Sequence, residues 1–274
     1  SFSGQGNHSV SVADVDQDGR DEIVYGSMVV DDDGSGRFST GLRHGDALHV
    51  SDLDPTRPGL EVWGIHENEK PVPGYENGFG AAMFDAATGE ILWGKVPGQD
   101  VGRGVAADID PEHLGAECWG SFGGLYDCRG RLIGRLPSST NFLCWWDGDL
   151  LRELLDGNHI DKYNGSRLLT ADGCASNNGS KSTPALSADL FGDWREEVMW
   201  RTLDGKELRI YTTTIPTTHR FATLMHDPQY RLSVAWQNVG YNQPPHVGFY
   251  LGVGMSPAAR PSIRTQPLQR VGGE

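Results

Sequence analysis

Short apolar runs alternate with acidic, glycine-rich turns along the whole chain. In SVADVDQDGRDEIVYG (residues 11–26), for example, closely spaced acidic residues are followed directly by the β-branched run EIVYG. Patterns with a helical period are almost absent, and the 37 glycines and 15 prolines suit tight turns between strands. The sequence of 274 residues therefore predicts an all-β fold with many short strands.

The acidic residues of this first stretch have the spacing of a metal-binding loop. Gly19 permits the sharp turn that wraps such a loop round an ion, and oxygen ligands in this number suit Ca²⁺. An EF-hand would continue as a helix, whereas an apolar strand follows here, so we expect the loop to join two strands. The expected ligands are four carboxylates and one backbone carbonyl, those of Asp14, Asp16, Asp18, Glu22 and Arg20.

The acidic pattern returns further along the chain. Two copies share one spacing, Asp52, Asp54, Glu61 and Asp108, Asp110, Glu117, and another carries Asp189, Asp193 and Glu197 with Phe191 between the aspartates. A shortened copy, Asp147, Asp149 and Glu153, is expected to have lost its ion. Polar turns without metal would explain one such loop but fit a matched series poorly, so we expect structural calcium ions.

The last glutamate of each copy marks a repeat. These glutamates lie at residues 22, 61, 117, 153 and 197, and gaps of about 36–56 residues are the period of propeller blades. We therefore expect a calcium-braced β-propeller with about five blades in one domain. The approximate blades are residues 1–43, 44–102, 103–140, 141–182 and 183–255, followed by a tail at 256–274.

The charge of the chain limits which partners it can bind, and its apolar runs and cysteines give two further expectations. The formal net charge of -14 and pI near 5.0 argue against nucleic acid, although an acidic polymer can bind where bound calcium supplies local cations. No run of about 20 apolar residues exists, so we expect no membrane span.

Cys118 and Cys128 flank an expected hairpin turn. They are predicted either to form a disulfide or, with Cys144 and Cys174, to be buried thiols.

Three polar runs fall at or beside the starts of expected inner strands, where propellers bind ligands. GQDVGRGVAADID contains Arg103, and ASNNGSKSTPALSADL contains Asn177 and Lys181. VAWQNVGYNQPPHVGFY contains Tyr241 and His246, together with several amides. Any one run reads equally well as an ordinary polar loop, but three runs that combine Arg, Lys, Tyr and amides favour a binding or catalytic site.

At these motifs the chain resembles a known family. ADVDxDGxDEI, HGDALHVSDLDPxRPGLEVW, GRGVAADIDP, NNGSKSTPxLSADLxGDWREE and WQNVGYNQPPH occur in the order found in polysaccharide lyase family 11, the bacterial rhamnogalacturonan lyases. The resemblance runs from about Gly6 to Gly254. It implies a secreted, eight-bladed, calcium-containing propeller that cleaves the rhamnose–galacturonic acid bond of pectin rhamnogalacturonan I by β-elimination.

The resemblance also implies site residues. Catalytic positions fall on Arg103, Lys181 and Tyr241, and substrate contacts on Asn178, Gly179, Ser180 and Asn238. Ser180 replaces a threonine of the family motif and keeps its hydroxyl. His44 with Asp46, and His66 with Glu67, are further candidates for ion or sugar contacts, although a lone histidine is more often structural.

The expected reaction uses these residue types. β-Elimination removes the C5 proton of a uronate, and a cation such as Ca²⁺ or Arg103 stabilises the enolate-like intermediate. Lys181 is the preferred base because neighbouring cations lower the pKa of a lysine, and Tyr241 would then protonate the leaving oxygen. The two roles remain interchangeable at this stage.

Length is the main departure from the family, whose members are roughly twice as long. We therefore expect this chain to be the C-terminal portion of a longer enzyme that needs an N-terminal portion for activity, with endo action favoured because no long insertion precedes Arg103. The alternative is a non-catalytic, calcium-stabilised propeller used for adhesion or carbohydrate binding. The set of Arg103, Lys181 and Tyr241 argues against that alternative.

Overall fold

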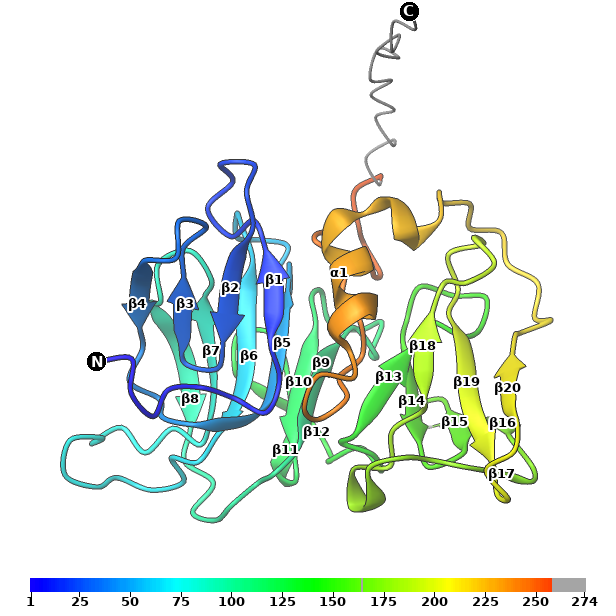
Figure 1. Ribbon diagram of the computed structural model, residues 1–274, viewed down its shortest axis with the longest axis horizontal. Coiled ribbons are helices and arrows are strands. Elements are labelled where there is room, and N and C mark those ends of the chain that lie inside the picture. The colour runs from blue at the N-terminus through cyan, green and yellow to red at the C-terminus, as the bar shows by residue number, and fades with distance from the viewer. Residues whose placement is uncertain (164, 258–274) are drawn as a thin grey trace, which may run out of the picture.

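The computed structural model describes residues 1–163 and 165–257. Within these residues, five four-stranded antiparallel sheets stand side by side round a helix (Figure 1). The first sheet contains β1 (Ser11–Ala13), β2 (Glu22–Tyr25), β3 (Met28–Val30) and β4 (Gly36–Ser39). The second contains β5 (Gly45–Ser51), β6 (Glu61–His66), β7 (Ala81–Asp85) and β8 (Ile91–Lys95). The third contains β9 (Gly104–Ala107), β10 (Glu117–Gly120), β11 (Phe122–Tyr126) and β12 (Leu132–Gly134).

The last two sheets complete the series. The fourth contains β13 (Phe142–Cys144), β14 (Glu153–Asp156), β15 (His159–Asp161) and β16 (Arg167–Thr170), and the fifth contains β17 (Cys174–Ala175), β18 (Leu186–Ala188), β19 (Glu197–Thr202) and β20 (Leu208–Tyr211). The first four sheets are simple meanders in chain order. The expected all-β architecture of about five blade-like units is confirmed.

The fifth sheet has a divided inner strand. β17 and β18 pair with successive stretches of β19, and β20 pairs with the other edge of β19. The break between β17 and β18 contains η1 (Gly179–Lys181), which projects from the sheet as a short turn. This sheet therefore begins at Cys174, ahead of the approximate boundary at residue 183 that the repeat suggested.

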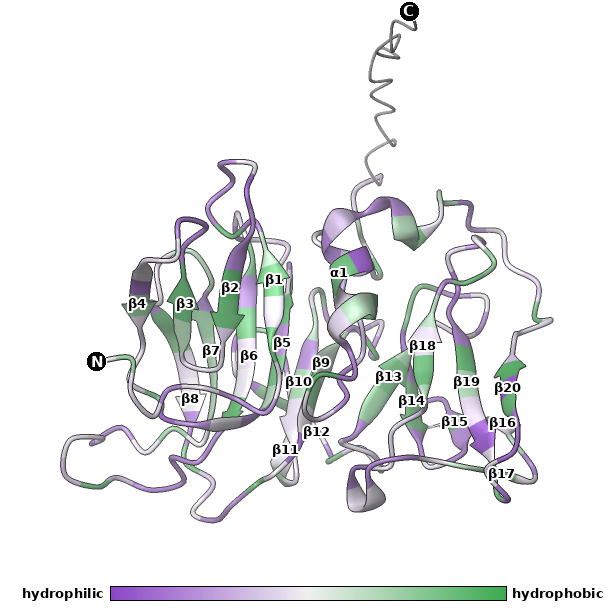
Figure 2. Ribbon diagram, in the orientation of Figure 1, coloured by the Kyte–Doolittle hydropathy of each residue, from purple (hydrophilic) through white to green (hydrophobic). Residues whose placement is uncertain are grey.

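Apolar side chains pack between neighbouring sheets, so each interior sheet buries both faces. Trp63 and Met83 of the second sheet pack with Ala106 and Cys118 of the third. Four such clusters link the five sheets in order. Figure 2 shows much of the strands in green or white and many of the connecting turns in purple, as burial of both faces favours.

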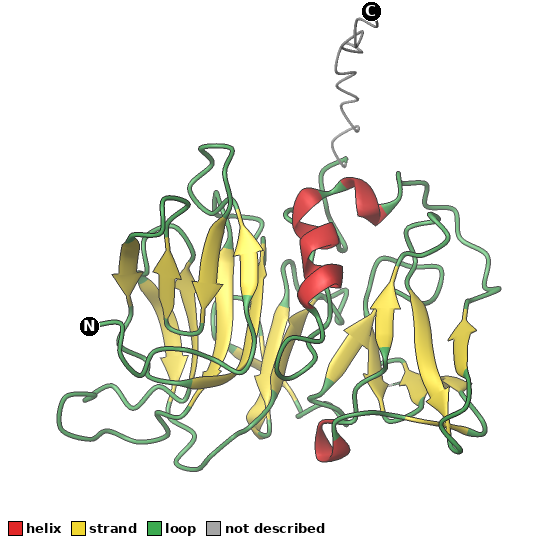
Figure 3. Cartoon of the chain, viewed as in Figure 1, coloured by secondary structure: helices red, strands yellow, loops and turns green. Residues whose placement is uncertain are grey.

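The chain leaves the sheets after Tyr211 and returns to the middle of the molecule. It forms η2 (Leu224–His226) and α1 (Pro228–Trp236), drawn in red in Figure 3. Asp227 caps α1 by accepting the Tyr230 N–H, and Pro228 follows at the first helical position. The expected fifth blade to residue 255 therefore contains no described strand after Tyr211. Residues 212–257 form instead a central helical segment, which contains η2 and α1.

The cysteine prediction is settled against a disulfide. All four cysteines are buried free thiols, and Cys118 lies opposite Tyr126 in the β10–β11 register rather than opposite Cys128. The bulge between Cys118 and Gly120 changes which residues face each other, which the spacing could not show. Among the described residues, no helix is long and apolar enough to cross a membrane.

Candidate functional site

In every sheet, the strand that follows the acid loop begins with a buried glutamate, and this glutamate closes the loop. These residues are Glu22, Glu61, Glu117, Glu153 and Glu197, each at most 1% exposed. In every case Oε2 accepts backbone N–H groups from the loop, at 2.7–3.4 Å. The glutamates therefore fold the loops whether or not an ion is bound. The shared use of Oε2 leaves Oε1 free to make a second interaction.

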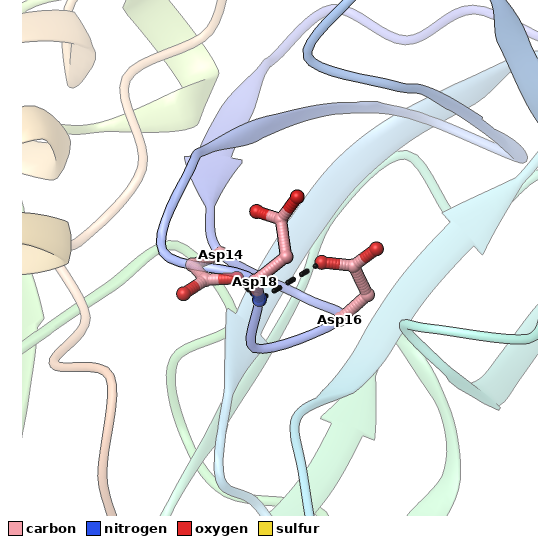
Figure 4. Close-up of side chains that lie close together, drawn as sticks. All are labelled: Asp14, Asp16 and Asp18. Atoms are coloured by element: carbon pink, nitrogen blue, oxygen red, sulfur yellow. Dashed lines mark hydrogen bonds between the residues drawn. The ribbon is translucent and has the colours of Figure 1, made fainter.

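The first loop gathers its carboxylates into a candidate metal site. Asp14, Asp16 and Asp18 each offer an oxygen within 4.8 Å of the others (Figure 4). A second group joins Asp16 and Glu22 to Asp31, which the sequence analysis did not select. Asp31 begins the turn after β3, and its proximity depends on strand pairing rather than on loop spacing. The Arg20 side chain pairs with Asp18 at 2.8 Å.

Buried oxygens without partners support metal binding in the first three loops. Among the described residues, Oε1 of Glu22, Glu61 and Glu117 has no hydrogen-bond partner. The same holds for Oδ1 of Asp52 and Asp108. Burial raises the pKa of Glu61 to about 7 and that of Glu117 to about 9. A cation would remove this penalty, so the donor set fits a metal ion.

Cationic side chains also reach these loops. Arg57 Nε lies 3.5 Å from Glu61 Oε1, and Arg129 Nε lies 3.6 Å from Asp54 Oδ2. In the third loop, Asp110 contacts His113 at 3.3 Å. These contacts neutralise part of the acidic charge but leave the five oxygens described above without hydrogen bonds.

The fifth loop is satisfied by protein donors. Asp189 Oδ2 accepts from the Thr223 hydroxyl and the Leu224 N–H, which ties the loop to η2. Glu197 Oε1 accepts from the Thr212 hydroxyl at 2.9 Å, and Asp193 pairs with Arg195 at 2.6 Å. These acids therefore have less need of an ion than those of the first three loops.

Arg103 lies buried at the start of β9, with 4% exposure. Its Nη2 donates to the Asn242 carbonyl at 3.0 Å and to the Asn141 carbonyl. Nε and Nη1 have no hydrogen-bond partner among the described residues. Burial lowers the pKa of Arg103 to about 10, so the guanidinium stays charged at neutral pH with two donors uncommitted.

Lys181 and Tyr241 meet although they are 60 residues apart in the sequence. The Lys181 ammonium lies 4.3 Å from the centre of the Tyr241 ring and donates to the Gly102 carbonyl at 3.4 Å. Burial lowers the pKa of Lys181, and Arg103 lowers it further while Asp46 opposes the change. The structure thus brings Lys181 beside Tyr241 and next to the backbone that carries Arg103.

The predicted substrate contacts border this group. Asn178 and Gly179 have left-handed backbones, with φ of 59° and 55°, which forms the turn that presents Lys181. The Ser180 carbonyl accepts from the Asn141 side chain at 3.4 Å. Asn238 is exposed and donates to the Ala185 carbonyl at 3.0 Å. The turn therefore presents Lys181, and Asn238 is bonded to Ala185, just after that turn in the sequence.

Sequence reasoning missed His8, which lies before β1. Its ring centre is 4.3 Å from that of Tyr241 and 4.7 Å from that of His44, and its Nε2 is 3.6 Å from Asp46 Oδ1. His44 and Asp46, proposed from HGDALH, thus lie in the same cluster. His8 stands alone in its sequence context, so only the fold identifies it.

Three other candidate residues lie outside the cluster of Lys181, Tyr241, His8 and Asp46. His66 is 2% exposed, bonds to the Ser27 hydroxyl at 3.1 Å and has its pKa lowered to about 3 by burial, which fits a structural role. Glu67 is exposed at the end of β6. His246 contacts His49 at 2.9 Å inside the molecule. His66 and His246 are therefore part of the scaffold.

Comparison with known proteins places these features in a family. Residues 1–261 match rhamnogalacturonan lyase family 11, C-terminal domain. The chain is 61% identical over 270 residues to rhamnogalacturonan endolyase YesW of Bacillus subtilis (strain 168), covering 96% of this chain and 42% of that protein. It is 54% identical over 286 residues to rhamnogalacturonan exolyase YesX of the same organism, covering 96% and 45%.

The fold comparison agrees. The crystal structure of rhamnogalacturonan lyase YesW superposes with a TM-score of 0.91 at 60% identity, covering 97% of this chain and 45% of that chain. This chain therefore spans less than half the length of the relatives that it matches.

Proposed function

Because the chain belongs to rhamnogalacturonan lyase family 11, as its C-terminal domain, we propose that it forms part of an enzyme that cleaves rhamnogalacturonan I. The proposed bond joins rhamnose to galacturonic acid, and the proposed reaction is β-elimination. The observation that carries the proposal is the placement of the Lys181 ammonium on the face of Tyr241, beside the start of β9 where Arg103 lies.

The proposed chemistry begins at C5 of the galacturonate. Removal of the C5 proton leaves negative charge on the carbon and carboxylate, and the C4–O bond then breaks to form a C4–C5 double bond. The released oxygen takes up a proton. Arg103 supports this step because it is charged and buried, and its Nε and Nη1 nitrogens have no hydrogen-bond partner among the described residues.

Lys181 is the proposed base. A lysine acts as a base only when it is neutral, and its lowered pKa increases the neutral fraction near the working pH. Tyr241 is the proposed acid that protonates the leaving oxygen. Its hydroxyl is on the same ring that the Lys181 ammonium contacts, so both groups can reach one sugar unit.

We propose calcium as the ion of the first three acid loops, and the polar set near His8 and Asp46 as a further ion or sugar contact. The loops fit calcium by their oxygen donors and their unpartnered buried oxygens. A bound calcium near the uronate would supply charge neutralisation of the carboxylate. Each acid loop follows the inner strand of its sheet, whereas η1 precedes the inner strand β18. The loops and η1 therefore lie at opposite ends of the inner strands, which favours a bracing role for the ions of the loops.

The five sheets are proposed to belong to an eight-bladed propeller completed by an N-terminal portion. The first and fifth sheets expose apolar side chains on their outer faces, among them Ile23, Tyr25, Leu208 and Ile210. Such side chains suit further packing. We further propose that the enzyme is secreted, since its substrate is a cell-wall polymer, and endo-acting, since β8 ends at Lys95 and β9 begins at Gly104 with only a short connection.

The test is the full-length protein mixed with rhamnogalacturonan I and calcium, followed by the ultraviolet absorbance of the unsaturated uronate. Lys181→Ala is expected to lower kcat by about 10²–10⁴-fold, the usual contribution of a general base. Lys206→Ala is the matched control because the Lys206 side chain is 81% exposed and pairs with the exposed Asp204. Normal turnover by Lys181→Ala would contradict the assignment of Lys181 as the base. If the wild-type protein forms no product, a binding module is favoured instead. Product length distinguishes endo from exo action.

A further inference from the structure

The residue opposite each closing glutamate differs among the sheets in a way that bears on metal binding. Glu61 of β6 pairs across the strands with Asp85 of β7. Ile23 pairs with Val30 and Cys118 with Tyr126, so the next residue of each pairing places Asp31 opposite Glu22 and Asp127 opposite Glu117. In these three sheets the glutamate Oε1 has no hydrogen-bond partner among the described residues. The opposite residue is an aspartate in each.

The fourth sheet carries a lysine at the same place. Leu154 pairs with Asp161, so the next residue pair is Glu153 and Lys162. The local turns are also alike. The Asp31 N–H donates to the Ser35 carbonyl at 2.8 Å and the Lys162 N–H donates to the Ser166 carbonyl at 3.2 Å. Lys162 therefore occupies the structural position of Asp31, with the opposite charge.

The Lys162 ammonium fills the centre of its acid loop. Its Nζ lies 2.8 Å from Asp147 Oδ2, 2.6 Å from Asp149 Oδ2 and 3.0 Å from Glu153 Oε1. These oxygens are the ones that the shortened loop would offer to an ion. Burial alone would disfavour the ammonium, but the three carboxylates raise the pKa of Lys162 above its ordinary value.

We propose that Lys162 is a built-in cation that takes the place of a metal ion in the fourth sheet, and that the residue opposite the closing glutamate selects between the two. An aspartate offers a further carboxylate to a divalent cation, although each of the three also pairs with an arginine: Asp31 with Arg37, Asp85 with Arg57 and Asp127 with Arg131. A lysine supplies three N–H donors and a positive charge from within the chain. The fourth loop then holds its fold without metal. The part of this proposal that concerns metal binding rests on the calcium proposed for the first three loops.

A charge exchange tests the selection directly. Lys162→Asp restores the aspartate of the first three sheets and is expected to bind one more calcium per chain than the wild-type protein in equilibrium dialysis. The same variant should unfold at lower temperature in chelator and recover with calcium. Lys206→Asp is the control because it makes the same charge change beside exposed Asp204, and its calcium count should equal that of the wild type.

The reciprocal variant is Asp31→Lys, which should bind one calcium fewer than the wild type. A Lys162→Asp protein that binds no additional calcium overturns the proposal, and so does one whose stability in chelator equals that of the wild type. A wild-type protein that binds no calcium would refute the proposed calcium sites. The gain expected of Lys162→Asp would still be measured separately.

Hydrogen exchange of the wild-type protein covers the case in which Lys162→Asp does not fold. Backbone amides of residues 146–153 should exchange at the same rate with calcium and with chelator, because Lys162 holds that loop. Amides of residues 14–22 should exchange faster in chelator. Faster exchange of residues 146–153 in chelator would contradict an internal cation.

Discussion

Lys181 shows how one side chain can acquire reactivity from its surroundings. Its ammonium is half-buried against Tyr241, and burial together with Arg103 lowers its pKa. Sequence analysis anticipated the direction of this shift from the nearby arginine. It did not anticipate that Asp46 opposes the shift, because Asp46 belongs to the second sheet and approaches only in the folded chain.

The proposed role of Lys181 predicts a pH profile. If neutral Lys181 is the base, kcat/KM should rise with pH through a midpoint below that of an ordinary lysine. Lys181→Arg keeps the positive charge but cannot lose its proton near neutral pH, so activity should fall at every pH tested. The measurement is initial rate against pH for both proteins. Substantial activity of Lys181→Arg would show that Lys181 contributes charge rather than proton transfer.

The central helical segment is the element that joins the sheets. Tyr230 of α1 donates to Glu196 Oε1 at 2.7 Å and accepts from the Asp189 N–H at 3.0 Å. Further along, the Pro245 carbonyl accepts from Arg152, and the Val247 carbonyl accepts from Ser51. The segment thus contacts the second, fourth and fifth sheets. Its buried polar side chains pair with backbone groups of the inner strands: Gln229 donates to the Val50 carbonyl of β5, and Gln237 bonds both the N–H and the carbonyl of Ser187 in β18.

Tyr230→Phe is expected to destabilise the protein by about 1–3 kcal/mol, because it leaves buried hydrogen-bonding groups without a partner. The ring and its packing remain, so the effect belongs to the hydroxyl. Chemical denaturation gives the free energy of unfolding. Tyr25→Phe serves as the control, since Tyr25 is 38% exposed. Equal stability of the two variants would contradict a joining role for this hydroxyl.

At the scale of the whole molecule, the buried carboxyls predict how metal-free protein responds to pH. Burial raises the pKa of Glu61 and Asp108 to about 7, and that of Glu117 to about 9. A carboxyl whose pKa is raised by folding stabilises the fold while it is protonated. That stability is lost as pH rises through the folded-state pKa.

In chelator, the melting temperature should therefore fall between about pH 6 and pH 9. Excess calcium should reduce this slope, because an ion that binds only the folded state stabilises it and favours the ionised carboxylates. Thermal unfolding at several pH values, with and without calcium, measures both effects. A melting temperature in chelator that does not change over this range would contradict the pKa values.

Local sequence patterns determined the strands, the acid loops and the closing glutamates. These features depend on contacts within a few residues, such as the bond from the Val15 N–H to Glu22 Oε2. The family motifs also placed Arg103, Lys181 and Tyr241 in one list of candidates. Composition and spacing were sufficient at this level because each acid loop is closed by its own strand.

Only the tertiary structure decided which distant residues meet. It placed His8 beside Tyr241, directed α1 through the middle of the sheets and left Cys118 and Cys128 as free thiols. It also set Lys162 opposite Glu153 where other sheets have an aspartate. These outcomes depend on strand register and on packing between sheets. Neither is encoded in the spacing of one short segment, since a shift of one residue changes every cross-strand partner.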